Sequence, residues 1–120
     1  MTPPQHPVHY IEIVTPDVEK MCELYSNSFG WIFQPASPQL GNARVTELQD
    51  GSLYGIRAPM HATEKALIRL YIRVQDIEAY VQKVTQTGGK ILLEPMKIPG
   101  YGIIAIYEIG GIEKGLWQVV

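Results

Sequence analysis

Polar and aromatic residues alternate along two β-rich segments, and these positions are the ones most able to do chemistry. Tyr10 and Glu12 lie in the first segment, and Arg69 and Tyr71 lie in the second. Alternate residues of a strand point to the same face, so each pair shares one side of its strand. A buried carboxylate and a buried guanidinium can neutralise each other as an ion pair, or they can contact a bound molecule. If Glu12 has no such partner, it becomes a candidate general base.

The same order of elements follows each of these segments. Strands are predicted at His9–Val14 and Ala66–Val74, because both are rich in β-branched and aromatic residues. An amphipathic helix follows each strand, with apolar residues at the spacing of one buried face. Asp17 and Asp76 are the expected N-caps, because an aspartate there accepts hydrogen bonds from the first free amides. Cys22 falls on the apolar stripe of the first helix, so we expect a core residue and not a reactive thiol.

Three shorter strands are expected after each helix, at Trp31–Gln34, Ala43–Gln49 and Ser52–Arg57 in the first half and at Lys90–Leu93, Tyr101–Tyr107 and Gly115–Val120 in the second. The order is therefore β-α-β-β-β, written twice. We expect one domain over residues 1–120, with module 1 at about 8–57, a linker at 58–65 and module 2 at about 66–120. Four strands cannot bury both faces alone, and pairing two modules solves that problem.

An internal repeat supports the two-module interpretation. Shifting the chain by 59 residues aligns identical residues at structurally marked positions, namely Ile13/Ile72, Asp17/Asp76, Glu19/Glu78, Gly30/Gly89 and Ile32/Ile91. These are strand, helix-start and helix-end positions, so the repeat follows the predicted elements.

Composition narrows the class of protein. The chain has 120 residues, with 10 Lys and Arg against 12 Asp and Glu, which gives a net charge of −2. Such a balance lacks the basic footprint of a nucleic-acid-binding protein. One cysteine excludes an internal disulfide. Residues 1–7 are neither basic nor followed by an apolar stretch, so no signal peptide is predicted. No apolar run approaches the about 20 residues of a membrane span. We therefore expect a cytoplasmic protein with no membrane partner.

The order and spacing of several short motifs together resemble a known superfamily. The motifs are Tyr10–Ile13 leading to Asp17, Leu24–Tyr25, Phe29–Trp31, Tyr71–Asp76, Thr87–Ile91, Ile98–Gly102 and Gly115–Gln118. They resemble the glyoxalase, bleomycin-resistance and extradiol-dioxygenase (vicinal oxygen chelate) superfamily over nearly the whole chain. The resemblance implies an α+β fold in which two tandem βαβββ modules form a curved mixed sheet, or half-barrel, around a central cavity with the helices outside.

The resemblance also implies four places from which metal ligands come in many members of the superfamily. In this sequence they fall at Tyr10, Gly55, Arg69 and Gln118. Glycine offers no side chain and a guanidinium has no lone pair, so this set is poorly suited to a divalent cation. We expect no metal and no cofactor, with the charge of Arg69 in place of the metal. A one-residue slip of the first strand would instead bring His9 to that face.

Three functions stay open. The first is a protein that binds a small hydrophobic or aromatic molecule in its cavity, through Tyr10, Glu12, Arg69, Tyr71, Tyr101 and Gln118. Trp117, which alternates with Gln118, is then expected beneath a helix. The second is a metal-dependent lyase, isomerase or dioxygenase with ligands such as His9, Glu12 and Gln118. The third is a non-catalytic interaction protein with a closed cavity. Catalytic residues are not assigned, and the expected partners are a small-molecule ligand and a second copy in a homodimer.

Overall fold

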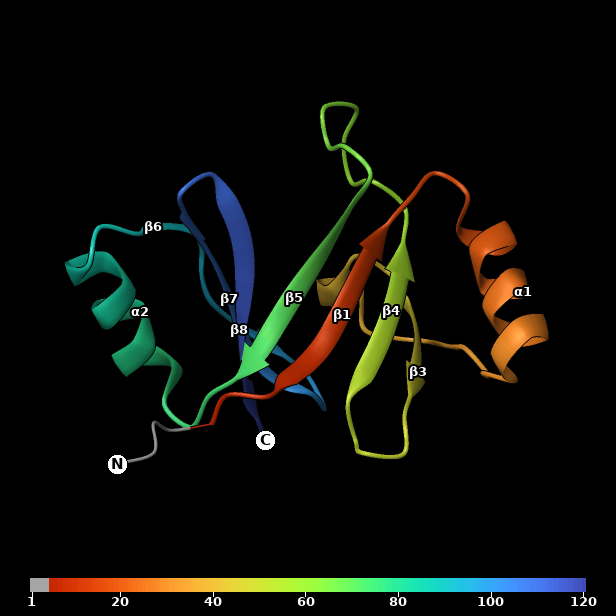
Figure 1. Cartoon of the computed structure of the whole chain (residues 1–120), viewed down its shortest axis with the longest axis horizontal. Helices are drawn as coiled ribbons and strands as arrows, with labels where there is room; N and C mark the ends of the chain where they lie inside the picture. The colour runs from red at the N-terminus through yellow and green to blue at the C-terminus, as the bar shows by residue number, and fades with distance from the viewer. Residues whose placement is uncertain (1–4) are drawn as a thin grey trace. The chain divides into compact units, whose positions relative to one another are not determined.

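The structure is a computed structural model, and it describes residues 5–120 (Figure 1). The strands are β1 (Val8–Val14), β2 (Gln34–Pro35), β3 (Arg44–Glu47), β4 (Leu53–Arg57), β5 (Leu67–Arg73), β6 (Lys90–Ile98), β7 (Gly102–Ile109) and β8 (Ile112–Val119). The helices are α1 (Val18–Phe29), α2 (Ile77–Gln86) and a short 3-10 helix at Pro38–Leu40. The absence of a signal peptide was expected partly from residues 1–4, which lie outside the described residues.

The chain forms two compact units whose boundaries fall inside β1 and β5. The first unit is Tyr10–Arg69, and it includes the predicted linker at 58–65. The second unit is Leu70–Val120 together with residues 5–9. Each unit carries one α-helix and four strands, so the α+β class and the two βαβββ modules are confirmed. The predicted central cavity stays a prediction.

The first unit is a four-stranded mixed sheet with α1 on one face. Its strand order is β2-β3-β4-β1, with β1 parallel to β4 and β3 antiparallel to its neighbours. The side of the sheet that faces α1 is closed by Ile13, Cys22 and Ile56. Burial raises the pKa of the Cys22 thiol, which fits the predicted core role. Pairing of β1 with β4 sets Glu12 opposite Gly55.

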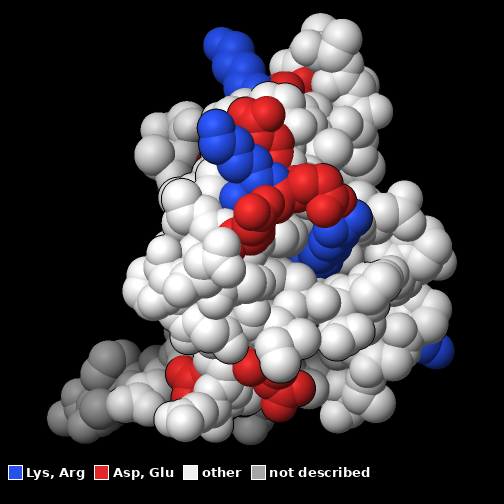
Figure 2. Space-filling model, turned by 90° about the vertical axis from the view of Figure 1, so that its right-hand side faces the viewer, with Lys and Arg blue, Asp and Glu red and all other residues white. Residues whose placement is uncertain are grey.

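Helix α1 buries Cys22 on one face, and its polar and apolar residues are also unevenly distributed along its length. Its charged residues lie in its first half, and its second half carries Leu24 and Phe29, which are 53% and 61% exposed. Figure 2 faces this helix and shows charged side chains gathered beside a broad uncharged area. Gly30 ends the helix in the left-handed region, with φ of 73°. Asp17 occupies the predicted N-cap position, but the expected capping hydrogen bond is not made by its side chain, and its amide donates to Thr15 Oγ1.

The second unit repeats this plan with the strand order β5-β8-β7-β6. Strands β5 and β8 are parallel, and Tyr71 lies opposite Gly115. The face toward α2 holds a larger apolar core, made of Val74, Ile77, Val81, Ala105 and Leu116. Asp76 caps α2 as predicted, because its carboxylate accepts a hydrogen bond from Ala79 N at 3.2 Å.

Three strands differ from the sequence prediction. The strand expected at Trp31–Gln34 is reduced to β2, because Trp31 packs on α1, stacked with Tyr25 at 5.2 Å between ring centroids. Strand β6 continues to Ile98, passing Pro95 with a register irregularity between Leu93 and Met96. Strand β8 already begins at Ile112. Over residues 5–120, neither helix is long and apolar enough to cross a membrane.

Candidate functional site

The face of the first unit that lies away from α1 carries Tyr10 and Glu12. Because Ile13 points to the helix, the alternation of β1 turns Tyr10 and Glu12 to the other side. This is the unslipped register that the sequence favoured. The Tyr10 ring lies directly over Gly55, where an added Cβ would come within 1.8 Å of the tyrosine oxygen. Glycine at this position is therefore what admits the ring.

Glu12 sits between two arginines on this face. One carboxylate oxygen accepts a hydrogen bond from Arg57 Nε at 2.9 Å, and the other accepts one from Arg69 Nη1 at 2.5 Å. All three side chains are nearly inaccessible, at 7% exposed or less. The general-base hypothesis for Glu12 required an unpartnered side chain, and this condition is not met, because the carboxylate accepts hydrogen bonds from two guanidinium groups. The alternative of an ion pair with Arg69 is confirmed.

The segment after β4 folds back and adds a second carboxylate to this network. Glu64 accepts two hydrogen bonds from Arg57, at 2.9 and 2.7 Å, and a third from Met60 N at 2.7 Å. The hydrogen bonds from Arg57 lower the pKa of Glu64 from its ordinary 4.5 to about 2. Burial opposes the charge on Arg57, but its hydrogen bonds to Glu64 and Glu12 outweigh burial and raise its pKa.

The corresponding face of the second unit is aromatic. The Tyr71 ring lies over Gly115, where an added Cβ would come within 2.0 Å of a ring carbon. Trp117 meets Tyr71 edge-on at 5.9 Å between centroids and Tyr101 at 6.4 Å. The Trp117 indole N–H also donates to the Tyr101 carbonyl oxygen at 3.1 Å. His9 lies against the same indole at 5.1 Å. Two predicted site residues, Tyr71 and Tyr101, are therefore both in contact with Trp117, which the sequence analysis had placed beneath a helix.

The expected orientations of Gln118 and Trp117 are wrong. Leu116 belongs to the core beneath α2, so Trp117 faces the other side, with Tyr71. Gln118 faces the helix, and its side-chain oxygen accepts a hydrogen bond from Ile77 N at 3.0 Å. The physical reason is register: because the side-chain period of a strand is two, a count that is off by one residue exchanges the two faces.

A divalent metal does not fit the positions that the resemblance implies. Gly55 matches Gly115 by register, and the next position on the same face is Arg57 in one unit and Trp117 in the other. Neither a guanidinium nor an indole supplies a lone pair to a metal. The carboxylate of Glu12 is held by two cations, whose charge repels a third. In the part of the chain that the structure describes, no group of three or more His, Cys, Asp or Glu side chains could hold a metal ion.

Three residues of these faces were missed by the sequence analysis, namely Arg57, Glu64 and Trp117. Arg57 lies two residues after Gly55 on the same strand, so alternation alone was a signal that it shares the face of Glu12. Trp117 had no such signal, because the face of Gly115 depends on the pairing of β5 with β8. Glu64 lies in a segment without strand or helix periodicity, and no local signal marks its contact with Arg57.

Comparison with known proteins agrees with this architecture. The profile of the Glyoxalase/Bleomycin resistance protein/Dioxygenase superfamily matches residues 7–113. A glyoxylase-like domain-containing protein from Didymella fabae is 32% identical over 95 residues, which cover 73% of this chain and 73% of that protein. The chain belongs to the Glyoxalase/Bleomycin resistance protein/Dioxygenase superfamily.

Solved structures share the fold at low sequence identity. The hypothetical protein BH1468 from Bacillus halodurans C-125 aligns with a TM-score of 0.79 and 16% identity, covering 98% of this chain and 96% of its own. A methylmalonyl-CoA epimerase from Mycobacterium tuberculosis aligns with a TM-score of 0.76 and 16% identity, covering 94% and 87%. At 16% identity these comparisons show a shared fold and nothing beyond it.

Proposed function

We propose that this protein binds a small hydrophobic or aromatic molecule without a protein-held metal ion, and that Arg69 meets an anionic or carbonyl oxygen of that molecule. The observation that carries the proposal is the pairing of Arg69 and Arg57 on Glu12. It fixes the direction of the Arg69 guanidinium on the sheet face from which, by the resemblance, many relatives supply metal ligands. A guanidinium held in place by a carboxylate is a ready partner for an oxygen anion.

The other predicted site residues have different parts in this proposal. In the first unit Tyr10 and Glu12 stay predicted polar contacts of the ligand, and Glu12 also fixes the direction of the Arg69 guanidinium. Tyr71 and Tyr101 stay predicted ligand contacts; within the second unit they pack around Trp117. Gln118 leaves the set, because its side chain faces α2. The methylmalonyl-CoA epimerase among the structural neighbours is named for a small organic substrate, which supports a small-molecule ligand in general terms.

A ligand screen with a chelator present tests the proposal. Aromatic carboxylates, aldehydes and ketones are screened by thermal shift against the full chain in EDTA, and hits are then titrated against variants. We expect hits that bind in EDTA, weaken in Arg69→Gln and recover in part in Arg69→Lys, which keeps the charge but not the planar fork. Arg44→Gln is the matched control, because Arg44 is a solvent-accessible arginine paired with Glu19. Hits that ignore Arg69, or that need a metal, contradict the proposal.

A second candidate is a non-catalytic interaction protein whose sheet faces are filled by its own side chains. The observation that favours it is burial: Tyr10, Tyr71 and Trp117 are each at most 1% exposed. The two candidates differ in what happens when room is made. If Tyr71→Ala gains affinity for the screened aromatics while the unchanged chain binds none, the filled-face candidate holds; binding by the unchanged chain excludes it.

The metal-dependent alternative has less support. Both oxygens of Glu12 already accept hydrogen bonds from arginines, and the side-chain oxygen of Gln118 accepts one from Ile77 N. His9 packs on an indole ring. The homodimer is also a proposal, and a monomeric mass by light scattering would contradict it. A cytoplasmic location stays a prediction, which cell fractionation tests.

A further inference from the structure

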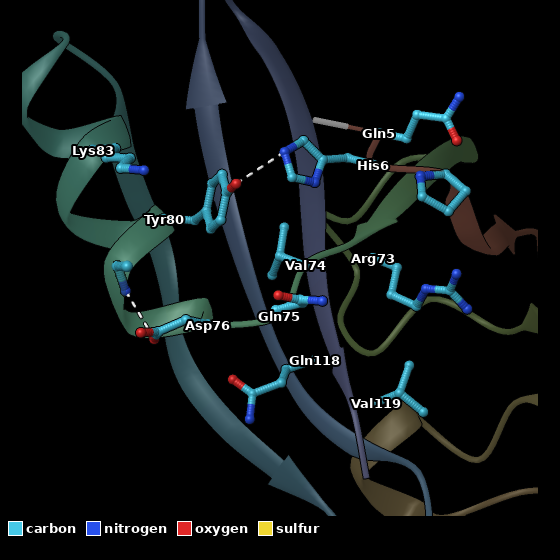
Figure 3. A pocket seen from close by; sticks show the side chains of 12 residues that line it. Gln5, His6, Arg73, Val74, Gln75, Asp76, Tyr80, Lys83, Gln118 and Val119 are labelled. Atoms are coloured by element: carbon cyan, nitrogen blue, oxygen red, sulfur yellow. Dashed lines mark hydrogen bonds between the residues drawn. The ribbon is translucent and has the colours of Figure 1, made fainter. Parts of the chain in front are cut away.

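A polar hollow of about 780 Å³ borders α2 in the second unit, and Figure 3 shows the side chains that line it. Tyr80 closes one side through a hydrogen bond of 3.0 Å between its hydroxyl and His6 Nε2. Lys83 and Gln118 point apart, so these two side chains do not converge on one ligand position. Charged side chains of the first unit do converge, and Arg57 lies at their centre.

Residues 58–65, called the strap from here on, connect β4 to β5 without helix or strand. Figure 1 shows this stretch as the light-green loop that stands beyond the end of β4. Apart from Pro59 and Glu64, its residues are all exposed. Within residues 10–69, every hydrogen bond from the strap to residues outside it goes to the guanidinium of Arg57. The polar attachment of the strap therefore depends on one side chain of the sheet.

Arg57 turns different nitrogens of its guanidinium to different partners. Glu12 on β1 accepts a hydrogen bond from Nε at 2.9 Å and so fixes the orientation of the group from the sheet. Nη1 and Nη2 face the strap, where they donate to the two carboxylate oxygens of Glu64 at 2.9 and 2.7 Å. Two parallel hydrogen bonds are a favoured geometry between an arginine and a carboxylate. The sheet thus orients a fork that fits one carboxylate, and Glu64 occupies it.

A second hollow, of about 610 Å³, has Arg57 and the strap residue Met60 in its lining. Gly41 lies against both, because an added Cβ would come within 2.7 Å of Arg57 Cδ and 3.4 Å of Met60 Cε. The other charged lining residues, Glu19 and Arg44, pair with each other. The hollow therefore offers room beside Arg57 for the apolar part of a small molecule.

We propose that Arg57 is a binding site for the carboxylate of a small apolar molecule, and that Glu64 occupies this site until the ligand displaces it and the strap opens. The exchange conserves charge and hydrogen bonds, because one carboxylate replaces another on the same two nitrogens. Glu64 has the advantage of its tether, which gives it an effective concentration of about a millimolar or more. The inference goes beyond the contact proposed for Arg69 and does not rest on it, because Arg69 is held by Glu12.

Chemical rescue tests the site. Glu64→Ala deletes a CH₂ group and a carboxylate, which together have the size of acetate. The full-length variant is heated at pH 7 in rising sodium acetate, against sodium chloride at equal ionic strength. We expect the substitution to lower the thermal midpoint by several degrees and acetate to restore at least half of that loss. Glu19→Ala is the matched control, because it removes the carboxylate partner of another arginine, the exposed Arg44.

Cleavage by trypsin after Lys65 reports opening of the strap in the unchanged chain. Lys65 is exposed and follows Glu64, and a protease cuts a held segment mainly when it opens. Cleavage after Lys20 in α1 is the internal control for unfolding of the whole unit. Acetate should raise the rate after Lys65 severalfold and leave the rate after Lys20 unchanged. Half of this effect should need roughly tenfold more acetate than half of the rescue in Glu64→Ala, because acetate competes with a tethered carboxylate.

Two results would overturn the site at Arg57. One is an acetate-specific rise in midpoint that is equal in Glu64→Ala and Glu19→Ala, and the other is a rise that persists when Arg57→Met is added to Glu64→Ala. No faster cleavage after Lys65, at ten times the acetate concentration that half-restores Glu64→Ala, would overturn the exchange. If Glu64→Ala does not fold, cleavage of the unchanged chain in acetate, against chloride, decides alone. None of these outcomes bears on ligands that need Arg69, so the function proposed above is tested separately.

Discussion

The two units share one backbone plan and place opposite chemistry on the sheet face away from the helix. In the first unit that face holds the network of Glu12, Arg57 and Arg69. In the second it holds aromatic rings around Trp117. Arg57 and Trp117 occupy matching register positions, because Val14 pairs with Arg57 and Arg73 pairs with Trp117.

Both units also keep a glycine beneath a tyrosine ring, Gly55 under Tyr10 and Gly115 under Tyr71. The repeat preserves the strand pairing and the glycine, but the ring over that glycine comes from different positions, because a shift of 59 residues aligns Tyr71 with Glu12 and Tyr10 with Arg69. The residue two positions after the glycine also differs. The same backbone arrangement therefore accommodates an ion-pair network in the first unit and packed aromatic rings in the second. The first unit should be sensitive to loss of a charge partner, and the second to loss of volume.

The largest effect is expected from Arg57→Met. It leaves Glu64 without its guanidinium partner and Glu12 with one instead of two. Breaking a buried ion pair on one side costs about 3–5 kcal/mol of unfolding free energy, measured by urea denaturation. Adding Glu64→Gln to this variant should recover part of the loss, because the unpaired charge is removed. A loss below about 1 kcal/mol would mean that the network does not stabilise the first unit.

Trp117→Phe is the corresponding test in the second unit. It removes the indole N–H that donates to Tyr101 O and leaves a small cavity against Tyr71. We expect a loss of about 2–3 kcal/mol in unfolding free energy. Trp31→Phe in the first unit is the control, and because Trp31 is half-buried it should cost less than about 1 kcal/mol. Equal costs for the two tryptophans would contradict the central place of Trp117.

Alanine at the two glycines sharpens the comparison further. At Gly55 the new methyl meets the far end of Tyr10, at the hydroxyl and Cζ; at Gly115 it meets the base of the Tyr71 ring, at Cδ2 and Cγ. A ring tip can yield more than a ring base. Overpacking of this kind costs about 1–3 kcal/mol, with Gly115→Ala at the upper end. Tyr10→Phe should partly rescue Gly55→Ala in thermal unfolding, whereas Tyr71→Phe should not rescue Gly115→Ala.

Acid pH should lower the stability of the first unit by a smaller amount, through Glu64. The pKa of Glu64 is about 2 in the folded chain, against its ordinary 4.5, so its contribution is complete above 4.5 and is lost as pH falls from 4.5 toward 2. Allowing for partial solvent screening, we expect about 1–2 kcal/mol from this group. Thermal midpoints measured over that range should fall more steeply for the unchanged chain than for Glu64→Gln. Identical pH profiles would show that Glu64 titrates normally.

Much of the fold was predictable because local rules determine it. The repeat, both helices and the core position of Cys22 follow from periodicity and from glycine placement. The pairing of Glu12 with Arg69 was weighed correctly as an alternative to a ligand contact. The shortening of β2 was not visible, because it results from Trp31 packing on Tyr25.

The orientation of the last strand was the main error of the sequence analysis. Gln118 and Trp117 are neighbours, and which of them faces α2 depends on the pairing of β5 with β8, a tertiary fact. Glu64 was missed for another reason. Its contact with Arg57 closes a turn of irregular backbone, where no periodic pattern marks a residue as important.

Metal independence is tested most directly by titrating the full chain, purified without chelators, with Mn²⁺, Ni²⁺ and Zn²⁺. Metal content and the thermal midpoint are followed together, with Glu12→Gln as the matched variant. Two guanidinium groups on Glu12 predict substoichiometric metal and no saturable rise in the midpoint. One bound metal per chain, with a saturable rise in the midpoint that Glu12→Gln abolishes, would contradict the proposed metal-free site.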